Sequence, residues 1–459
     1  MSETIQPPVK DVDDPEYAAN LRRATLASTA GSALEYYDFA LYGLASALIF
    51  SKLFFSALDP ATALIASFAT FGVGFVARPL GGLFFGTIGD RLGRKWVLIV
   101  TILLMGGSST LVGALPTYDQ IGVWAPILLV FLRLCQGFGA GAEQAGATVL
   151  MAEYAPVNRR GYYAALPFIG IQGGTLLAAL VFTYLGGLDS AVLLGWVWRI
   201  PFLASFVLIL IALFIRMRLR ESPTFVALEK HDQIAEHPMK EIFGHSLPSV
   251  LRGIGLRMAE NGGSYLFNTL AVAYATGTIG VNKSIGPIAV AVGSLIGMLS
   301  VPIAGHISDR VGRVPVYRFG SVVLLVLAFP SWWLISLGQS WLVIALIAVM
   351  IGFGVNTMLG AQCALLPELF GSRHRYLGVA IAREFSAVIA GGLAGILGAV
   401  LIKAYDGSWV PLGIYTFVLA AITFATTFVT PETVRRDLTQ IPDALDEVRA
   451  GRGLIKETS

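Results

Sequence analysis

The chain has 459 residues, of which 55% are hydrophobic and only 13% are charged. Soluble proteins carry about 25% charged residues, so this composition excludes an ordinary soluble domain and indicates that lipid is the main solvent. A mean hydropathy of +0.72 agrees with this interpretation. The net charge of +3 is too small to predict a nucleic-acid partner.

The first 23 residues are polar and include the four acids Asp11, Asp13, Asp14 and Glu16. They have neither the apolar core nor the small-residue cleavage site of a secretory signal peptide. We therefore interpret residues 1–23 as a cytoplasmic tail.

Beyond this tail, apolar runs recur that are long enough to cross a hydrocarbon core of about 30 Å. They cover residues 26–50, 62–86, 96–116, 124–150, 162–186, 196–217, 248–276, 285–307, 316–338, 341–366, 377–402 and 409–430. These runs predict an all-α membrane protein with about twelve transmembrane helices.

The longest polar connection follows the sixth run and divides the chain into two halves. We expect one six-helix bundle over 24–217, a cytoplasmic loop over 218–247 and a second six-helix bundle over 248–430. A cytoplasmic tail follows over 431–459, and it could form a short surface helix.

Basic residues gather in alternate loops. They are Arg22 and Arg23, then Arg91, Arg94 and Lys95, Arg159 and Arg160, Arg216, Arg218 and Arg220, Arg310 and Arg313, Arg373 and Arg375, and finally Arg435 and Arg436. The loops between them hold only the single lysines Lys52, Lys283 and Lys403. The positive-inside rule therefore predicts that both termini lie on the cytoplasmic side of a cell membrane.

A loop motif occurs twice. GTIGDRLGRK, residues 86–95, and GHISDRVGRV, residues 305–314, both fit G-x-x-x-D-R-x-G-R, and their aspartates are 219 positions apart (309 − 90). We predict gating roles for ten of these residues, which are Gly86, Asp90, Arg91, Gly93 and Arg94 in the first copy and Gly305, Asp309, Arg310, Gly312 and Arg313 in the second.

The residue types of the motif suggest how it could hold one membrane face shut. The acid ends a helix and can accept hydrogen bonds from the free N–H groups of a neighbouring helix N-terminus. The arginines can pair with carboxylates across the two halves, and the glycines permit a tight turn. The alternative is that the motif is only a topogenic positive cluster, but its repetition at matching positions argues against this.

A second, weaker repeat follows each motif. Glu153 precedes Arg159 and Arg160 in the first half, as Glu368 precedes Arg373 and Arg375 in the second half. Internal repeats of this kind are common in alternating-access carriers.

With this motif, the chain resembles the major facilitator superfamily over nearly its whole length. The stretches GSALEYYDFALYG (31–43), ATFGVGFVARPLGGLFFGTIGDRLGRK (69–95), RLCQGFGAGAEQAGATVLMAEYAP (133–156) and WVWRIPF (196–202) are similar to its metabolite:proton symporters. The resemblance implies two pseudo-symmetric six-helix bundles. It also implies import of organic acids such as shikimate and 2-oxoglutarate, or of zwitterions such as proline and betaine, with the proton as the usual coupling ion.

Ionisable residues inside a membrane span cost roughly 2.5–3.5 kcal/mol each, so they are functional candidates by default. The candidates for substrate binding and proton coupling, together with polar neighbours, are Glu35, Tyr36, Asp38, Arg78, Arg133, Glu143, Gln172, Arg257, Glu260, Asn261, Arg383 and Glu384. Glu35 and Asp38 are three residues apart, as are Arg257 and Glu260, so each pair is expected on one helix face.

The buried charges favour a carboxylate substrate. Arginine presents a planar fork that can hold a carboxylate by two hydrogen bonds, and Arg78, Arg133 and Arg383 are the candidates for this contact. A carboxylate in a partly dry cavity takes up a proton more readily than one in water. This role could fall to Glu35, Asp38, Glu143 or Glu260. The alternative is structural ion pairing, either between Arg133 and Glu143 or between Arg257 and Glu260.

We therefore expect a secondary transporter that imports a small organic acid with a proton by alternating access. The alternatives are a symporter of a zwitterionic osmolyte and a facilitator or exporter of another metabolite. An enzyme is disfavoured because no nucleophile elbow, HExxH or phosphate loop occurs. We expect a monomer in the lipid bilayer with no cofactor besides the proton. We expect no metal, because Cys135 and Cys363 form no paired motif.

Overall fold

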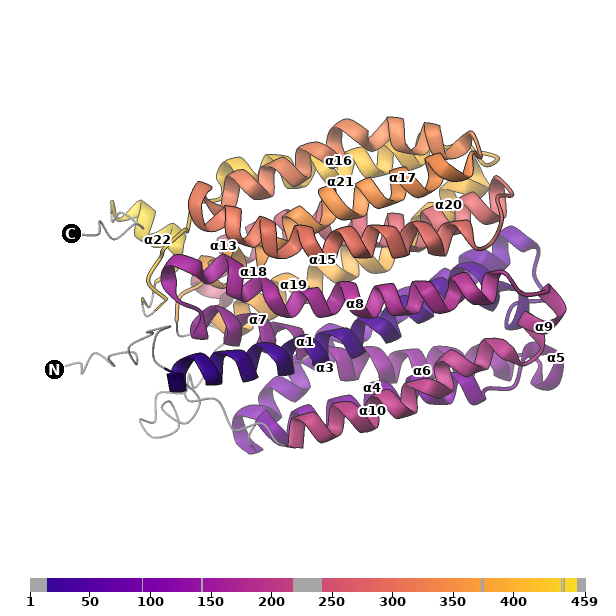
Figure 1. The fold of residues 1–459 in the computed structure, drawn as a ribbon, viewed down its shortest axis with the longest axis horizontal. Helices are drawn as coiled ribbons and strands as arrows, with labels where there is room; N and C mark the ends of the chain where they lie inside the picture. Colours follow the sequence, from indigo (N-terminus) through magenta and orange to yellow (C-terminus); the bar gives the residue numbers. More distant parts are fainter. Residues whose placement is uncertain are drawn as a thin grey trace.

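The structure is a computed structural model that describes residues 15–92, 94–141, 143–217, 242–372, 375–438, 440 and 442–451. In this part of the chain, each of the twelve predicted spans is matched by a helical segment. The segments lie roughly parallel or antiparallel in one elongated bundle, and α1 begins at the same end of the bundle as α22 (Figure 1).

Six helical segments make the first half. They are α1 (Pro15–Ala45) with the π-helical turn η1 (Ser46–Phe50), α3 (Pro60–Leu92), α4 (Arg94–Ala114), α6 (Trp124–Ala140) with α7 (Glu143–Tyr154), α8 (Arg160–Gly186), and α10 (Ile200–Met217). The short helices α2 (Ser51–Leu53), α5 (Tyr118–Ile121) and α9 (Ser190–Gly195) connect them at one end.

The second half repeats this plan. Its first segment is α13 (Leu247–Tyr265), which is continued by η5 (Leu266–Leu270), α14 (Ala271–Ala273) and η6 (Tyr274–Thr278). The next two are α15 (Ile285–Val311) and α16 (Arg313–Ser336). The last three are α17 (Ser340–Val349) with η7 (Met350–Val355) and α18 (Asn356–Leu369), then α19 (Arg375–Ser386) with η8 (Ala387–Gly392) and α20 (Leu393–Ala404), and finally α21 (Val410–Val429). Several of these segments change to a π-helical turn at mid-length, which is a feature often found near functional sites.

Eight of the described helical segments are long and apolar enough to cross a membrane. The segments that begin with α1 and α13 are not among the eight. Both carry buried charged residues, namely Glu35 and Asp38 in α1 and Arg257 and Glu260 in α13. Two of the helical segments outside the eight thus bring charge into the interior.

Close helix packing within the first half depends on small residues. A Cβ on Gly137 of α6 would lie 1.9 Å from the carbonyl oxygen of Gly74 in α3, and one on Gly174 of α8 would lie 2.1 Å from that of Ala33 in α1. Such contacts let backbones approach closely where apolar side chains gain little from leaving lipid. Large apolar residues such as Leu299 and Phe319 remain exposed on the outer surface.

The two halves meet where α8 lies beside α15 (Figure 1). At one end of this contact, a Cβ on Gly161 would lie 2.4 Å from the carbonyl oxygen of Gly305. On another side of the interface, a Cβ on Gly72 of α3 would lie 2.7 Å from the carbonyl oxygen of Gly392 in η8. The halves are therefore in direct backbone contact.

Among the described residues, helices extend into both predicted tails, and a short helix in the second tail was expected. Helix α1 begins at Pro15, inside the segment 1–23. The segment after α21 forms the short helix α22 (Ala444–Arg449), and it also buries Arg436 completely against the bundle. The predicted loop 218–247 falls mostly outside the described residues, except for η4 (Ile242–Ser246) and the start of α13.

Candidate functional site

A small cavity lies between the halves. Its lining comes from α1 and α8 on one side and from α13, η5, η7 and α18 on the other, and it consists of Tyr36, Ile171, Gln172, Thr175, Glu260, Asn261, Ser264, Tyr265, Asn268, Ile351, Val355, Asn356 and Leu359. Its volume of about 30 Å³ has room for one or two water molecules. This cavity is therefore too small for a metabolite, and we call this arrangement of the described residues the closed state.

An amide pair bridges the halves across this cavity. Gln172 Nε2 donates to Asn356 Oδ1 at 2.7 Å, and Asn356 Nδ2 donates back to Gln172 Oε1 at 3.4 Å. Asn261 Nδ2 and Asn268 Oδ1 are buried without a hydrogen-bond partner among the described residues. Buried polar atoms are usually satisfied, so these two atoms leave capacity for a polar ligand.

Arg78 joins the two halves by charge. Its Nε donates to Glu384 Oε2 at 2.8 Å in the second half, and its Nη2 donates to Glu35 Oε1 at 3.4 Å in the first half. All three side chains are buried, and the guanidinium lies 4.9 Å from the ring centroid of Phe39. Arg78 is thus committed to two carboxylates in this state.

Arg383 has unused hydrogen-bonding capacity. Its Nη2 donates to Gln144 Oε1, and Gln144 Nε2 donates in turn to Glu35 Oε1 at 3.1 Å. The Nε and Nη1 of Arg383 have no acceptor in the described part of the chain, although the side chain is only 2% exposed. A buried charged donor without a partner is costly. Arg383 is therefore the arginine best placed to receive an anion.

Arg257 and Glu260 form the ion pair that their spacing suggested. Arg257 Nη1 lies 3.1 Å from Glu260 Oε2 on the same helix. Arg257 also donates to Gln362 and, at 2.8 Å, to Ser386 Oγ. Glu260 additionally lines the cavity, where Gln362 Nε2 donates to it at 3.0 Å.

Asp38 faces a different environment from Glu35, although the two acids are one helical turn apart. Ser109 Oγ of α4 donates to Asp38 Oδ2 at 2.9 Å, and Ser205 Oγ of α10 donates to Oδ1 at 2.8 Å. Asp38 thus points into the first half, whereas Glu35 contacts Arg78 and Gln144 near the interface. Their spacing of three residues on α1 agrees with the predicted common helix face, but the two acids have different partners.

Arg133 is enclosed by aromatic rings inside the first half. It is fully buried, and its guanidinium lies 4.8 Å from Phe39, 4.4 Å from Tyr42 and 4.8 Å from Phe71, measured to the ring centroids. It donates to Gln136, whose Nε2 donates to Ser109 Oγ at 2.7 Å. A hydrogen-bonded chain therefore runs from Arg133 to Asp38, and only the Nη2 of Arg133 has no hydrogen-bond partner among the described residues.

The alternative pairing of Arg133 with Glu143 concerns a side chain outside the described residues. The same holds for the side chains of the first motif copy, Gly86, Asp90, Arg91, Gly93 and Arg94. The geometry of the motif is therefore taken from the second copy.

Asp309 of the second copy caps a helix of the other half. Its Oδ1 accepts from the backbone N–H of Gly161 at 2.7 Å, and its Oδ2 accepts from that of Tyr162 at 2.9 Å. These groups belong to the N-terminus of α8, where free N–H donors and the helix dipole favour a carboxylate. We call the end of the bundle that carries residues 305–313 the motif end.

The other motif residues divide into structural and exposed ones. Arg313 is fully buried and lies 2.8 Å from Asp309 and 3.1 Å from Glu368, both in its own half, while Arg310 is exposed. Gly312 has a φ of +111°, which lets the chain turn directly from α15 into α16. The expected pairing of motif arginines across the halves is therefore not seen in the second copy.

Pairs between the halves come instead from the weaker repeat. Arg160 Nη1 lies 2.8 Å from Glu368 Oε1, and Arg375 Nη1 lies 3.0 Å from Glu153 Oε1. The acid of each half thus pairs with the arginine of the other half. The repeat identified these residues, but it carried no signal that they would pair crosswise.

Three layers follow one another from the middle of the interface to the motif end. The cavity comes first, and then an apolar cluster from both halves, made of Ala164, Ala165, Phe168, Ile171, Val301, Leu359 and Cys363. The ionic contacts of Glu368 and Asp309 follow.

At the opposite end of the bundle, two lysines make hydrogen bonds between the halves. Lys283 Nζ donates to Ser190 Oγ at 2.5 Å, and Lys403 Nζ donates to Thr62 Oγ1 at 2.6 Å.

Two family models match the chain, one described as sugar (and other) transporter over residues 24–250 and one as Major Facilitator Superfamily over residues 254–457. The chain is 36% identical to the shikimate transporter of Escherichia coli strain K12, over 86% of this chain and 91% of that protein. It is also 36% identical to the proline/betaine transporter of the same organism, over 95% of this chain and 89% of that protein. The fold is similar to that of the proton:xylose symporter XylE, with a TM-score of 0.71 and 18% identity over 92% of this chain and 98% of the other.

Proposed function

The chain belongs to the major facilitator superfamily of membrane transporters, and from this premise we propose that it imports a small organic acid together with a proton by alternating access. The two relatives are named for different solutes, one for shikimate and the other for proline and betaine. The choice of substrate class therefore rests on the buried charges of this chain.

The unpartnered donors of Arg383 are the observation that carries the proposal. The side chain is buried, its Nε and Nη1 lack acceptors among the described residues, and it lies 5.8 Å from the ring of Phe168 in the apolar layer beside the cavity. A substrate carboxylate would supply two charge-assisted hydrogen bonds to these donors. The amides of Asn261 and Asn268 would hold the remaining polar groups.

Asp38 is the acid that we propose as the proton carrier. Glu35, Glu260 and Glu384 each contact an arginine directly, so protonating any of them would weaken or remove a buried ion pair. Among the described residues, the hydrogen-bond donors to Asp38 are two serine hydroxyls, which can equally accept a hydrogen bond from a protonated carboxyl group. Asp38 can therefore change its charge at the least cost to its neighbours.

The ionic contacts at the motif end form the gate that we place on the cytoplasmic side. Rocking of the halves would separate Arg160 from Glu368, Arg375 from Glu153 and Asp309 from α8. Both charges of each pair would then enter water, and their hydration would offset part of the lost electrostatic attraction. This exchange of partners suits a gate that must both close and open.

The experiment is uptake of labelled carboxylates into proteoliposomes under an imposed inward proton gradient. Accumulation should collapse with a protonophore, and Arg383→Ala should abolish it. Arg159→Ala, which removes an exposed arginine of the first half, is the matched control and should retain uptake. Unchanged uptake in Arg383→Ala would overturn the anion-binding role.

A zwitterionic solute is the second candidate, and Glu260 is the observation that favours it. This carboxylate lines the cavity, where it could face a substrate ammonium group. Its ion pair with Arg257 at 3.1 Å already neutralises Glu260. A carboxylate substrate is therefore the stronger candidate. Competition of the labelled carboxylate by betaine but not by other acids would reverse this order.

A further inference from the structure

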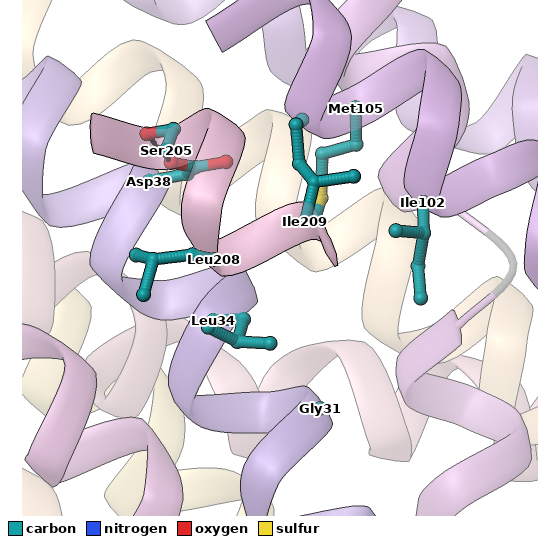
Figure 2. A pocket seen from close by; sticks show the side chains of 9 residues that line it. Gly31, Leu34, Asp38, Ile102, Met105, Ser205, Leu208 and Ile209 are labelled. Carbon is teal, nitrogen blue, oxygen red and sulfur yellow. Dashed lines mark hydrogen bonds between the residues drawn. The ribbon is translucent and has the colours of Figure 1, made fainter. Parts of the chain in front are cut away.

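A second cavity lies inside the first half, away from the interface. It is lined by Gly31, Leu34, Asp38, Ile102, Met105, Gly106, Ser205, Leu208 and Ile209, which come from α1, α4 and α10. Figure 2 shows Asp38 and Ser205 together at one end of this cavity and Gly31 at the other, with Leu34, Leu208 and Ile209 between them. Its volume of about 20 Å³ is close to that of a single water site.

The cavity extends from Asp38 toward the motif end. On α1, Gly31 is closer than Asp38 to the helix start at Pro15, and on α4, Ile102 is closer than Ser109 to the start at Arg94. On α10, Ile209 is closer than Ser205 to the end at Met217. Asp38, Ser205, Ile102 and Ile209 are buried, whereas Gly31, Leu34 and Leu208 are partly exposed.

Apolar side chains close this route. Ile102 and Ile209 form a separate small core cluster against which Leu34 and Leu213 pack. We call Leu34, Ile102, Leu208 and Ile209 the collar. Apolar constrictions block ions by excluding water. The collar therefore isolates Asp38 from the motif end in this closed state.

We propose that the collar is a hydrophobic valve on a proton route through the first half, which connects Asp38 to the motif end separately from the substrate cavity. The proposal rests on the proposed role of Asp38 as proton carrier. When the halves rock and α1, α4 and α10 shift, water enters the collar and the proton leaves Asp38 for the cytoplasm. The substrate leaves by the central route between the halves.

The groups that face Asp38 fit this division. From α4 and α10 it meets the hydroxyls of Ser109 and Ser205. Arg133 on α6 is linked to it by hydrogen bonds through Gln136 and Ser109. Tyr37, beside it on α1, donates its hydroxyl to Pro201 O. Since none of these contacts is a direct ion pair, the state of the collar decides whether Asp38 can exchange its proton.

The test is a proton leak measured in proteoliposomes without substrate, with a pH-sensitive dye inside and an imposed membrane potential. Ile209→Ser and Ile102→Ser each add a hydroxyl and space to the collar. Each should raise the leak on the order of tenfold, because the collar then admits water. Ile335→Ser, at a fully buried site of the second half, should leave the leak unchanged.

The double variant Asp38→Asn with Ile209→Ser separates the route from general damage. The leak should return to the background level, because the carrier is absent. A leak that persists in the double variant, or no added leak in single variants that still exchange labelled for unlabelled substrate, would overturn the valve. If Asp38→Asn alone still accumulates substrate against a gradient, the proposed proton role fails instead, whatever the collar does.

Discussion

Three buried arginines show how partners, rather than burial, distinguish the roles of similar residues. Arg78 is held by two carboxylates, Arg133 is enclosed by aromatic rings, and Arg383 keeps two donors without acceptors in the part of the chain that the structure describes. The sequence indicated all three equally, because each is a charge within an apolar run. Their partners come from helices distant in the chain, such as Glu384 for Arg78, and periodicity carries no signal for such contacts.

At the residue scale, Asp38→Asn should separate coupling from transport. The amide keeps hydrogen-bonding capacity toward Ser109 and Ser205 but cannot exchange a proton. We expect proton-driven accumulation to be lost while exchange of labelled for unlabelled substrate continues. Accumulation at the wild-type level would exclude Asp38 as the coupling acid.

At the element scale, the contact of the motif acid with the N-terminus of α8 is the part of the proposed gate that the motif chemistry anticipated. The expectation that an acid would accept from a helix N-terminus is met by Asp309 and the N–H groups of Gly161 and Tyr162. Sequence reasoning missed the crosswise pairs with Arg160 and Arg375. That arrangement depends on how the two halves dock, which local spacing does not determine.

Gly161→Leu should force the gate open, because a Cβ at this position would lie 2.4 Å from the carbonyl oxygen of Gly305. Cys363 reports this opening, since it is 1% exposed and belongs to the apolar layer below the gate. In a Cys135→Ala background, we expect maleimide labelling of Cys363 to rise severalfold. Gly195→Leu, where an added Cβ meets nothing within 4 Å, should remain unlabelled.

The segment after α21 is a further element of the gate. Arg436 is fully buried, and its guanidinium donates to Glu447 at 2.7 Å and to Phe370 O at 3.0 Å. The carbonyl oxygen of Arg436 accepts from Arg160 Nη1 of the other half at 2.9 Å. The segment predicted as a polar tail thus contacts both halves at the motif end.

Arg436→Ala should loosen this end, because it leaves the buried carboxylate of Glu447 without its cation. Breaking a buried pair in this way costs roughly 3–5 kcal/mol. We expect faster labelling of Cys363 and a lower thermal unfolding temperature. The neighbouring Arg435 is exposed, so Arg435→Ala is the control. Equal effects of the two variants would contradict the assigned role of Arg436.

At the scale of the whole molecule, hydropathy and the repeated motif were enough to predict twelve helical segments in two similar halves. Lipid enforces this, since backbone groups in hydrocarbon must be satisfied within helices. The closed state could not be predicted from the sequence. A cavity of about 30 Å³ results from one docking of two rigid bundles, and another docking of the same helices would open it.

The central claim is that one chain carries a carboxylate and a proton together, and paired flux measurement tests it most directly. Labelled acid and internal pH would be followed in the same proteoliposomes, with wild type, Arg383→Ala and Asp38→Asn side by side. We predict that substrate addition acidifies the wild-type interior in step with uptake, and that neither variant shows coupled entry. Uptake of the acid with no proton movement, or proton-coupled uptake that survives in Asp38→Asn, would contradict the account.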